Sequence, residues 1–176
     1  MVWEQDPQCL TGTHLTTGHV VQEGYGVLDG GATKTMASIR ALEQLEAKCG
    51  HQPGVGIHKL DVQETPTFGF GNSHKSRCVS TCYYKMPIKE KSMSLKIHAL
   101  DEGDAPVLIS VDSLRKLGAI VDFRSDQAVF CDINTNKLVD LKRTSAGHQL
   151  IPLTEDFLQQ GKTFPRAATS LAQLVE

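Results

Sequence analysis

The chain lacks any long run of apolar residues and any strong excess of one charge. It has 176 residues, with 18 Lys and Arg against 20 Asp and Glu, so its formal net charge is −2. No apolar run approaches the roughly 20 residues that a membrane-spanning helix needs. A nearly balanced charge also offers no basic surface for nucleic acid or for an anionic membrane. We therefore expect neither a membrane nor a direct nucleic-acid partner.

The N-terminal residues lack the features of a secretory signal. Met1–Asp6 has neither the basic region nor the apolar stretch of a signal peptide. A disulfide framework is missing as well, since the five cysteines are an odd number and their spacing does not build one. We therefore expect an intracellular protein, cytoplasmic by default and not secreted, whose thiols are ordinary groups in a reducing compartment.

Paired ligands for a metal ion are also missing. A zinc site usually needs a tight Cys or His pair in each half of the site, whereas Cys9, His14 and His19 are loosely spaced and have no matching second pair. Cys78 and Cys82 are four residues apart, which on a strand places them on one face. None of the scattered histidines accompanies a Ser or Cys nucleophile elbow. We expect no metal and no cofactor.

What remains is a composition of 40% hydrophobic and 22% charged residues, which suits one globular domain with tails. Apolar residues recurring at three and four positions predict an amphipathic helix over 35–50, with Thr35 as its cap. A short helix is predicted over 111–117, capped by Ser110 and ended by Gly118. Alternating patterns and β-forming side chains predict the strands. These strands lie at 18–21, 24–28, 78–86, 93–100, 107–109, 119–123, 128–131, 138–141 and 148–153.

The most informative motif is Gly26–Thr33, in which an apolar strand runs into Asp29 and small residues follow. Glycine permits unusual φ angles and a close backbone approach, so backbone N–H groups could reach the carboxylate. A carboxylate held at such a turn is what an aspartic protease requires. The alternative is that Asp29 is an ordinary turn residue beside a strand.

The motif resembles the Asp-Thr/Ser-Gly-Ala signature of retropepsin-like proteases, with Gly30 where the family has Thr or Ser. Pro106–Phe123 is similar to the late hallmark of that family, in which an apolar triplet and usually a Gly precede a short helix and a strand. Here Ser110 replaces the Gly. The resemblance covers 18–153 and is to the protease regions of copia-type retrotransposon Gag-Pol polyproteins.

The resemblance implies a mainly β, retropepsin-like closed β-barrel or sandwich, which is one lobe of the acid-protease fold, with one or two short helices. It also implies the domain organisation. Residues 1–17 would be a flexible N-terminal segment, 18–153 the protease domain, and 154–176 a helical or disordered tail.

The resemblance further implies Asp29 as the catalytic residue. Around it, the family pattern places an active-site loop, a substrate-binding flap and an active-site floor. These are Gly30, Gly31 and Ala32 for the loop, Phe68, Gly69, Phe70, Gly71 and Asn72 for the flap, and Leu108, Ile109 and Ser110 for the floor. An ordinary surface hairpin is the alternative for 68–73. Two further carboxylates, Asp112 and Asp122, are interpreted as structural, in the first turn of the short helix and at a strand end.

Aspartic proteases use two carboxylates that share one proton, and this chain supplies one candidate while being too short for two lobes. The implied protein is therefore a homodimer that hydrolyses a polypeptide substrate, with one Asp29 from each copy. Because Gly30 cannot make the hydroxyl bond that the family makes across the dimer, an inactive remnant or a domesticated peptide-binding or dimerisation module is an alternative. An unrelated β-rich binding domain is a third.

Overall fold

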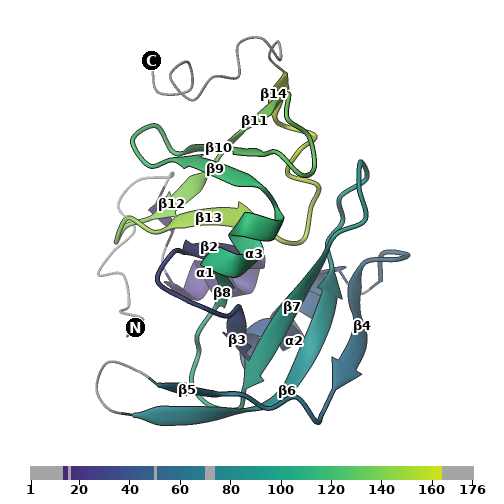
Figure 1. Cartoon of the computed structure of the whole chain (residues 1–176), viewed down its shortest axis with the longest axis vertical. Helices are drawn as coiled ribbons and strands as arrows, with labels where there is room; N and C mark the ends of the chain where they lie inside the picture. Colours follow the sequence, from purple (N-terminus) through teal and green to yellow (C-terminus); the bar gives the residue numbers. More distant parts are fainter. Residues whose placement is uncertain (1–13, 16, 50, 70–73, 164–176) are drawn as a thin grey trace.

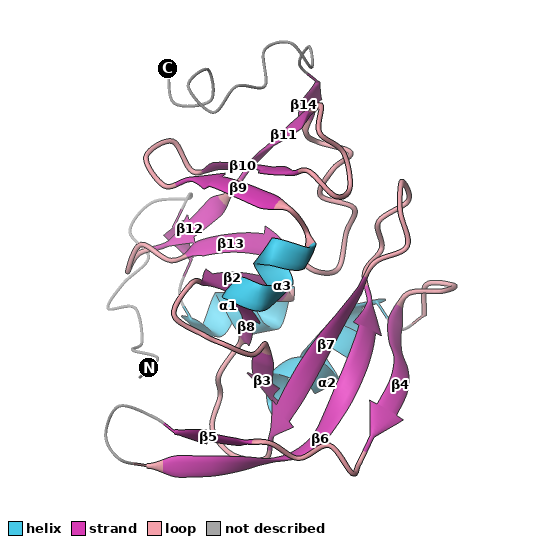
Figure 2. Cartoon of the chain, in the orientation of Figure 1, coloured by secondary structure: helices cyan, strands magenta, loops and turns pink. Residues whose placement is uncertain are grey.

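The computed structural model describes residues 14–15, 17–49, 51–69 and 74–163, and these residues form a mainly β fold (Figures 1 and 2). The three helices within them are α1 (Thr17–Glu23), α2 (Ile39–Cys49) and α3 (Val111–Lys116). The strands in the first half are β1 (His14–Leu15), β2 (Tyr25–Asp29), β3 (Met36–Ser38), β4 (Gly56–Asp61), β5 (Thr67–Gly69), β6 (Lys75–Lys85) and β7 (Ser94–Leu100). The strands in the second half are β8 (Val107–Ser110), β9 (Ala119–Asp122), β10 (Gln127–Phe130), β11 (Lys137–Asp140), β12 (Lys142–Thr144), β13 (Gln149–Pro152) and β14 (Lys162–Thr163).

The strands form two sheets that share a buried core. The larger runs β1-β12-β13-β2-β8-β3-β7-β6-β4, with β5 paired to β6, and the smaller runs β14-β11-β10-β9. Side chains from both sheets, such as Ile109 and Phe130, belong to one cluster of buried residues. No closed barrel is found among the described strands, so that part of the expectation is not met.

Two neighbouring strands in the centre of the larger sheet, β2 and β8, end side by side. The parallel strands β2 and β8 pair so that Asp29 is opposite Ser110, and β3 pairs on the other side of β8. Gly26 leaves room for the side chain of Ile109 to pack over β2, since a Cβ at Gly26 would lie 2.6 Å from Cδ1 of Ile109. The register therefore places the end of β2 next to the start of α3 (Figure 1).

Most of the predicted strands are confirmed, with their ends moved by a few residues. Those at 24–28, 78–86, 93–100, 107–109, 119–123, 128–131, 138–141 and 148–153 correspond to β2, β6, β7, β8, β9, β10, β11 and β13. The sequence pattern missed β4 because that strand lies at the sheet edge and buries little beyond Gly56, which leaves no alternation to detect.

The long helix begins later than predicted. α2 starts at Ile39, and Ser38 rather than Thr35 caps it, since the Ser38 Oγ accepts a hydrogen bond from the N–H of Ala41 at 3.2 Å. Residues 36–38 instead form β3, because Met36 pairs with both β7 and β8 and is buried there. Tertiary strand pairing therefore overrides the local helical periodicity.

Two further expectations are wrong. The strand expected at 18–21 is the middle of α1, whose Val20 is fully buried, because a short apolar run does not by itself distinguish helix from strand. Residues 154–163, expected to be helical or disordered, form turns and β14, and Phe157 packs edge-on against Phe130 with ring centroids 5.1 Å apart. Residues 164–176 and 1–13 lie outside the described residues, so the domain boundaries stay predictions.

The two neighbouring cysteines of β6 do not share a face. Cys78 pairs with Leu100 and Cys82 with Ile97, and a register shift after Cys78 places the thiols in different core clusters. Burial raises the pKa of each thiol to about 11, so both stay protonated at neutral pH. Both are ordinary buried thiols, as expected.

The short helix α3 matches the prediction. Ser110 caps it by accepting from the N–H of Ser113 at 3.1 Å, and Gly118 follows its end with φ of 63°. A Cβ at Gly118 would lie 2.8 Å from the backbone nitrogen of Asp132, so only glycine fits this turn. Asp112 lies in the first turn and pairs with Lys116 at 3.4 Å.

Candidate active site

The candidate catalytic carboxylate is buried, and only one of its two oxygens has a hydrogen-bond partner among the described residues. Asp29 ends β2 with 8% of its surface exposed. One oxygen, Oδ1, accepts a hydrogen bond from the N–H of Gly31 at 3.0 Å, whereas Oδ2 is buried and has no hydrogen-bond partner among the described residues. A buried polar atom without a partner is costly, so Oδ2 is an atom to which a ligand or a second polypeptide could bind.

The loop after Asp29 is held by backbone hydrogen bonds. Ala32 donates its N–H to the carbonyl of Asp29 at 3.2 Å, and the carbonyl of Ala32 accepts from the N–H of Val111 at 3.1 Å. Neither Gly30 nor Gly31 adopts a positive φ, so the expected unusual backbone angles are wrong here. An added Cβ at Gly31 would lie at ordinary contact distance, 3.4 Å from Oδ1 of Asp29, so the approach of this backbone to the carboxylate does not require glycine.

Asp29 lines a solvent-open cavity of about 110 Å³ together with residues from four other segments. The wall is largely apolar and combines the active-site loop with β3, β5 and β8. Its members are Asp29, Gly31, Ala32, Thr33, Met36, Phe68, Gly69 and Leu108. The structure therefore brings the start of the predicted flap to the predicted catalytic loop, although 36 residues or more separate them in the chain.

The predicted flap is described only at its base. Phe68 and Gly69 belong to β5, which pairs with the start of β6 as the expected hairpin would. Phe70, Gly71 and Asn72 lie outside the described residues. In Figure 1, β5 and the start of β6 lie side by side below β3, at the end of the sheet.

The three predicted floor residues have different environments. Leu108 lines the cavity, Ile109 is fully buried in the shared core, and the side chain of Ser110 is 1% exposed and bonds to Thr35 and Ser113. Gly30 is exposed and is not among the residues that line the cavity. Of the three predicted floor residues, Leu108 lines the cavity, whereas Ile109 and Ser110 do not.

Three residues near the site were not predicted as site residues, and one of them, Thr33, lines the cavity just after the predicted loop. Thr35 and Met36 were expected to begin the long helix, but Met36 belongs to β3 and lines the cavity, and Thr35 directly precedes β3 and accepts a hydrogen bond from the N–H of Ser110. No local signal distinguishes them, since an apolar residue after a threonine is equally typical of a capped helix.

A buried histidine lies behind the base of the flap. The rings of His98 and Phe68 are 6.0 Å apart, and the His98 Nδ1 lies 2.7 Å from the hydroxyl of Thr81. That hydroxyl donates to the carbonyl of Glu64, so it accepts the proton on Nδ1. Burial lowers the pKa of His98, with smaller effects from the charges of Glu64, Lys34 and Lys96.

The remaining expectations from the sequence concern metal ligands, Asp122 and membrane-spanning helices. Within the described residues, no three His, Cys, Asp or Glu side chains are placed so that they could hold a metal ion. Asp122 ends β9 as expected, and its carboxylate accepts from the hydroxyl of Ser125 and the N–H of Arg124, which lowers its pKa. No helix in the described part of the chain has the length and apolarity to cross a membrane.

Comparison with known proteins does not identify a family. No protein-family model matches the chain, and no curated protein matches its sequence. The resemblance to retropepsin-like proteases therefore stays a prediction.

Proposed function

We propose that the chain is a retropepsin-like aspartic endopeptidase that acts as a homodimer, with Asp29 as its catalytic residue. One observation carries the proposal. A buried carboxylate ends a central strand and lines a cavity open to solvent, one of its oxygens is fixed by a backbone N–H, and the other is buried without a hydrogen-bond partner among the described residues. A turn residue of purely structural value would use both oxygens or expose them to water.

The partner in this proposal is a second copy of the chain. Peptide hydrolysis by carboxylates needs two of them sharing one proton, and each chain brings one Asp29. The cavity of about 110 Å³ is also smaller than the roughly 300–1,000 Å³ of typical ligand sites. A two-fold axis beside Gly30 would join two such cavities and place both carboxylates together.

The proposed reaction uses only the two carboxylates and water. The ionised Asp29 takes a proton from the water, whose oxygen attacks the carbonyl carbon of the scissile peptide bond. The protonated Asp29 of the other copy gives its proton to the carbonyl oxygen. The resulting diol then gives a proton from one hydroxyl to the Asp29 that is now ionised, the carbon–nitrogen bond breaks, and the Asp29 that is now protonated gives its proton to the amine nitrogen. No covalent link to the enzyme forms.

The peptide is proposed to bind in extended form beneath the flap that begins at Phe68. The wall formed by Ala32, Met36 and Leu108 offers apolar contacts to one of its side chains. A retroelement polyprotein processed inside the cell is the substrate that the sequence resemblance favours, and an intracellular location goes with that proposal.

A second candidate function follows from Gly30. This residue is exposed, and nothing lies within 4 Å of the position that its Cβ would occupy. It therefore offers no hydroxyl to a partner, which favours a protein that keeps the fold but binds peptide or dimerises without cutting. This candidate predicts binding at the same cavity and no hydrolysis.

The deciding experiment compares wild type with Asp29→Asn on a mixed peptide library between about pH 4 and 7. Protein concentration is varied, because a dimeric enzyme gains specific activity as it associates. Cleavage that requires Asp29 and rises more steeply than concentration supports the endopeptidase. Peptide binding or dimerisation by a folded protein that never cleaves would instead support the second candidate.

A further inference from the structure

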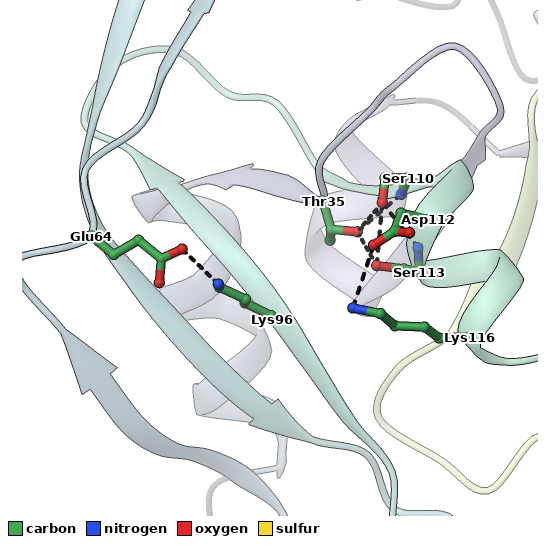
Figure 3. A network of polar contacts seen from close by, with 7 residues as sticks. All are labelled: Thr35, Glu64, Lys96, Ser110, Asp112, Ser113 and Lys116. Carbon is green, nitrogen blue, oxygen red and sulfur yellow. Dashed lines mark hydrogen bonds and ion pairs between the residues drawn. The ribbon is translucent and has the colours of Figure 1, made fainter.

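Three hydroxyl groups meet behind the candidate active site, and they come from three different elements. Thr35 precedes β3, Ser110 ends β8, and Ser113 lies in α3. Figure 3 shows their oxygens pointing toward one another. Thr35 Oγ1 is 3.1 Å from Ser110 Oγ and 2.6 Å from Ser113 Oγ, and the two serine oxygens are 3.3 Å apart.

The three hydroxyls form a closed ring. Thr35 donates to Ser110, Ser110 donates to Ser113, and the proton of Ser113 completes the ring by going to Thr35. Two backbone groups add to it, because the N–H of Ser110 donates to Thr35 Oγ1 at 3.0 Å and the N–H of Ser113 donates to Ser110 Oγ at 3.1 Å. Each hydroxyl thus donates once, and neighbouring hydrogen bonds in such a ring strengthen one another.

The ring connects to Asp29 through the backbone. Ser110 is the register partner of Asp29, and the next residue, Val111, donates its N–H to the carbonyl of Ala32. The N–H of Ala32 donates to the carbonyl of Asp29, and the N–H of Gly31 donates to Oδ1 of the Asp29 carboxylate. A shift of Ser110 would therefore move the loop that holds the carboxylate.

We propose that Thr35, Ser110 and Ser113 are positioning residues that hold the Asp29 loop at the distance which a carboxylate pair sharing one proton requires. The inference depends on the proposed function, because it concerns the geometry of that pair. Thr35 also fixes the far side of the loop, since its carbonyl accepts from the N–H of His98 at 3.0 Å. Where the resembled family has Gly, Ser110 thus supplies one member of the ring.

The test measures kcat, KM and the full pH profile of kcat/KM for wild type and four variants. Thr35→Val removes one hydroxyl at nearly constant volume, and Thr35→Ser restores it. Ser113→Ala is the milder change, because the hydrogen bonds that the N–H groups of Ser110 and Ser113 donate to the ring can both remain. If Thr35→Val does not fold, Ser113→Ala tests the positioning role. Thr144→Val is the matched control: Thr144 is 1% exposed, its hydroxyl accepts from the N–H of His148, and β13 separates it from β2.

The pH profile distinguishes positioning from simple stability. Two carboxylates that share a proton titrate with apparent pKa values spread far apart, and a larger separation brings those values together. We expect Thr35→Val and Ser113→Ala to narrow the bell-shaped profile and to lower kcat about tenfold to a hundredfold with little change in KM. Thr35→Ser and Thr144→Val should keep the width of the wild-type profile.

Two results would overturn the inference, and they can be told apart. Variants that lose folded protein but keep the wild-type profile would show that the ring only stabilises the fold, while the endopeptidase proposal stands. Absence of any Asp29-dependent cleavage by wild type would overturn the proposed function and, with it, the positioning role.

Discussion

Asp29 and Ser110 are register partners at the carboxyl ends of the parallel strands β2 and β8. The two side chains nevertheless have different environments. Asp29 leaves Oδ2 without a partner beside the cavity, whereas the Ser110 hydroxyl is bonded within the buried ring formed with Thr35 and Ser113. The side chain at the end of β2 thus keeps an oxygen that can still accept a hydrogen bond, whereas the side chain at the end of β8 is already hydrogen-bonded to neighbouring elements.

Asp29→Asn should keep the protein at least as stable as wild type. The carboxylate is buried with one oxygen unpaired, and the substitution replaces an ionisable group by a neutral amide whose oxygen can still accept from Gly31. We expect the free energy of unfolding at pH 7 to rise by about 0 to 2 kcal/mol, measured by urea denaturation. Asp112→Asn, which alters an exposed ion pair with Lys116, should change it by less than about 1 kcal/mol. A clear loss of stability in Asp29→Asn would mean that both carboxylate oxygens serve the fold.

Gly30→Thr should tighten the proposed dimer. The monomer can accept the side chain, because nothing lies within 4 Å of the added Cβ. Two symmetry-related hydroxyl bonds at about 1 kcal/mol each correspond to a dissociation constant about thirtyfold lower. Sedimentation equilibrium and the concentration dependence of activity would measure it.

Gly30→Ala is the matched control for this change, since it adds the Cβ without the hydroxyl. Its dissociation constant should stay close to that of wild type. Equal tightening by alanine, or none by threonine, would contradict a hydroxyl bond across a two-fold axis at this loop.

Gly26→Ala should destabilise the protein. The added Cβ would lie 2.6 Å from Cδ1 of Ile109 and 3.2 Å from Cδ1 of Leu153, and both side chains are fully buried. Overpacking of this kind typically costs about 1–3 kcal/mol of unfolding free energy. Gly69→Ala, where nothing lies within 4 Å, should cost less than about 0.5 kcal/mol. Equal urea midpoints for the two variants would show that the side chains of Ile109 and Leu153 can move aside without cost.

His98 should make stability depend on pH. Its folded pKa is lowered by burial, so the unfolded chain, with an ordinary histidine pKa of about 6.5, binds a proton more readily. Stability is therefore fully present above about pH 6.5 and is lost as the pH falls from there toward the lower folded pKa. His98→Asn keeps a donor for Thr81 and should flatten this slope. Urea denaturation across this range measures it.

His51→Asn serves as the control for the pH dependence, because His51 is exposed in the turn after α2. It should leave the slope of stability against pH as in wild type. A slope that survives in His98→Asn would assign the pH dependence to another group.

Local sequence patterns were enough to predict the strand carrying Asp29, the turn after it and the capped helix after Ser110. These features depend on residues close together in the chain, through alternation of apolar side chains and through capping by neighbouring hydroxyls. The resemblance to a protease family pointed to the same Asp29.

The surroundings of that carboxylate depend instead on contacts between distant segments of the chain. The start of α2 at Ile39, the contribution of Met36 to the cavity and the ring between Thr35 and Ser110 all depend on strand pairing, and those two ring members are 75 residues apart. A local pattern shows which side chains prefer burial. Their partners are chosen by the free energy of burying distant segments together and of satisfying their polar groups there.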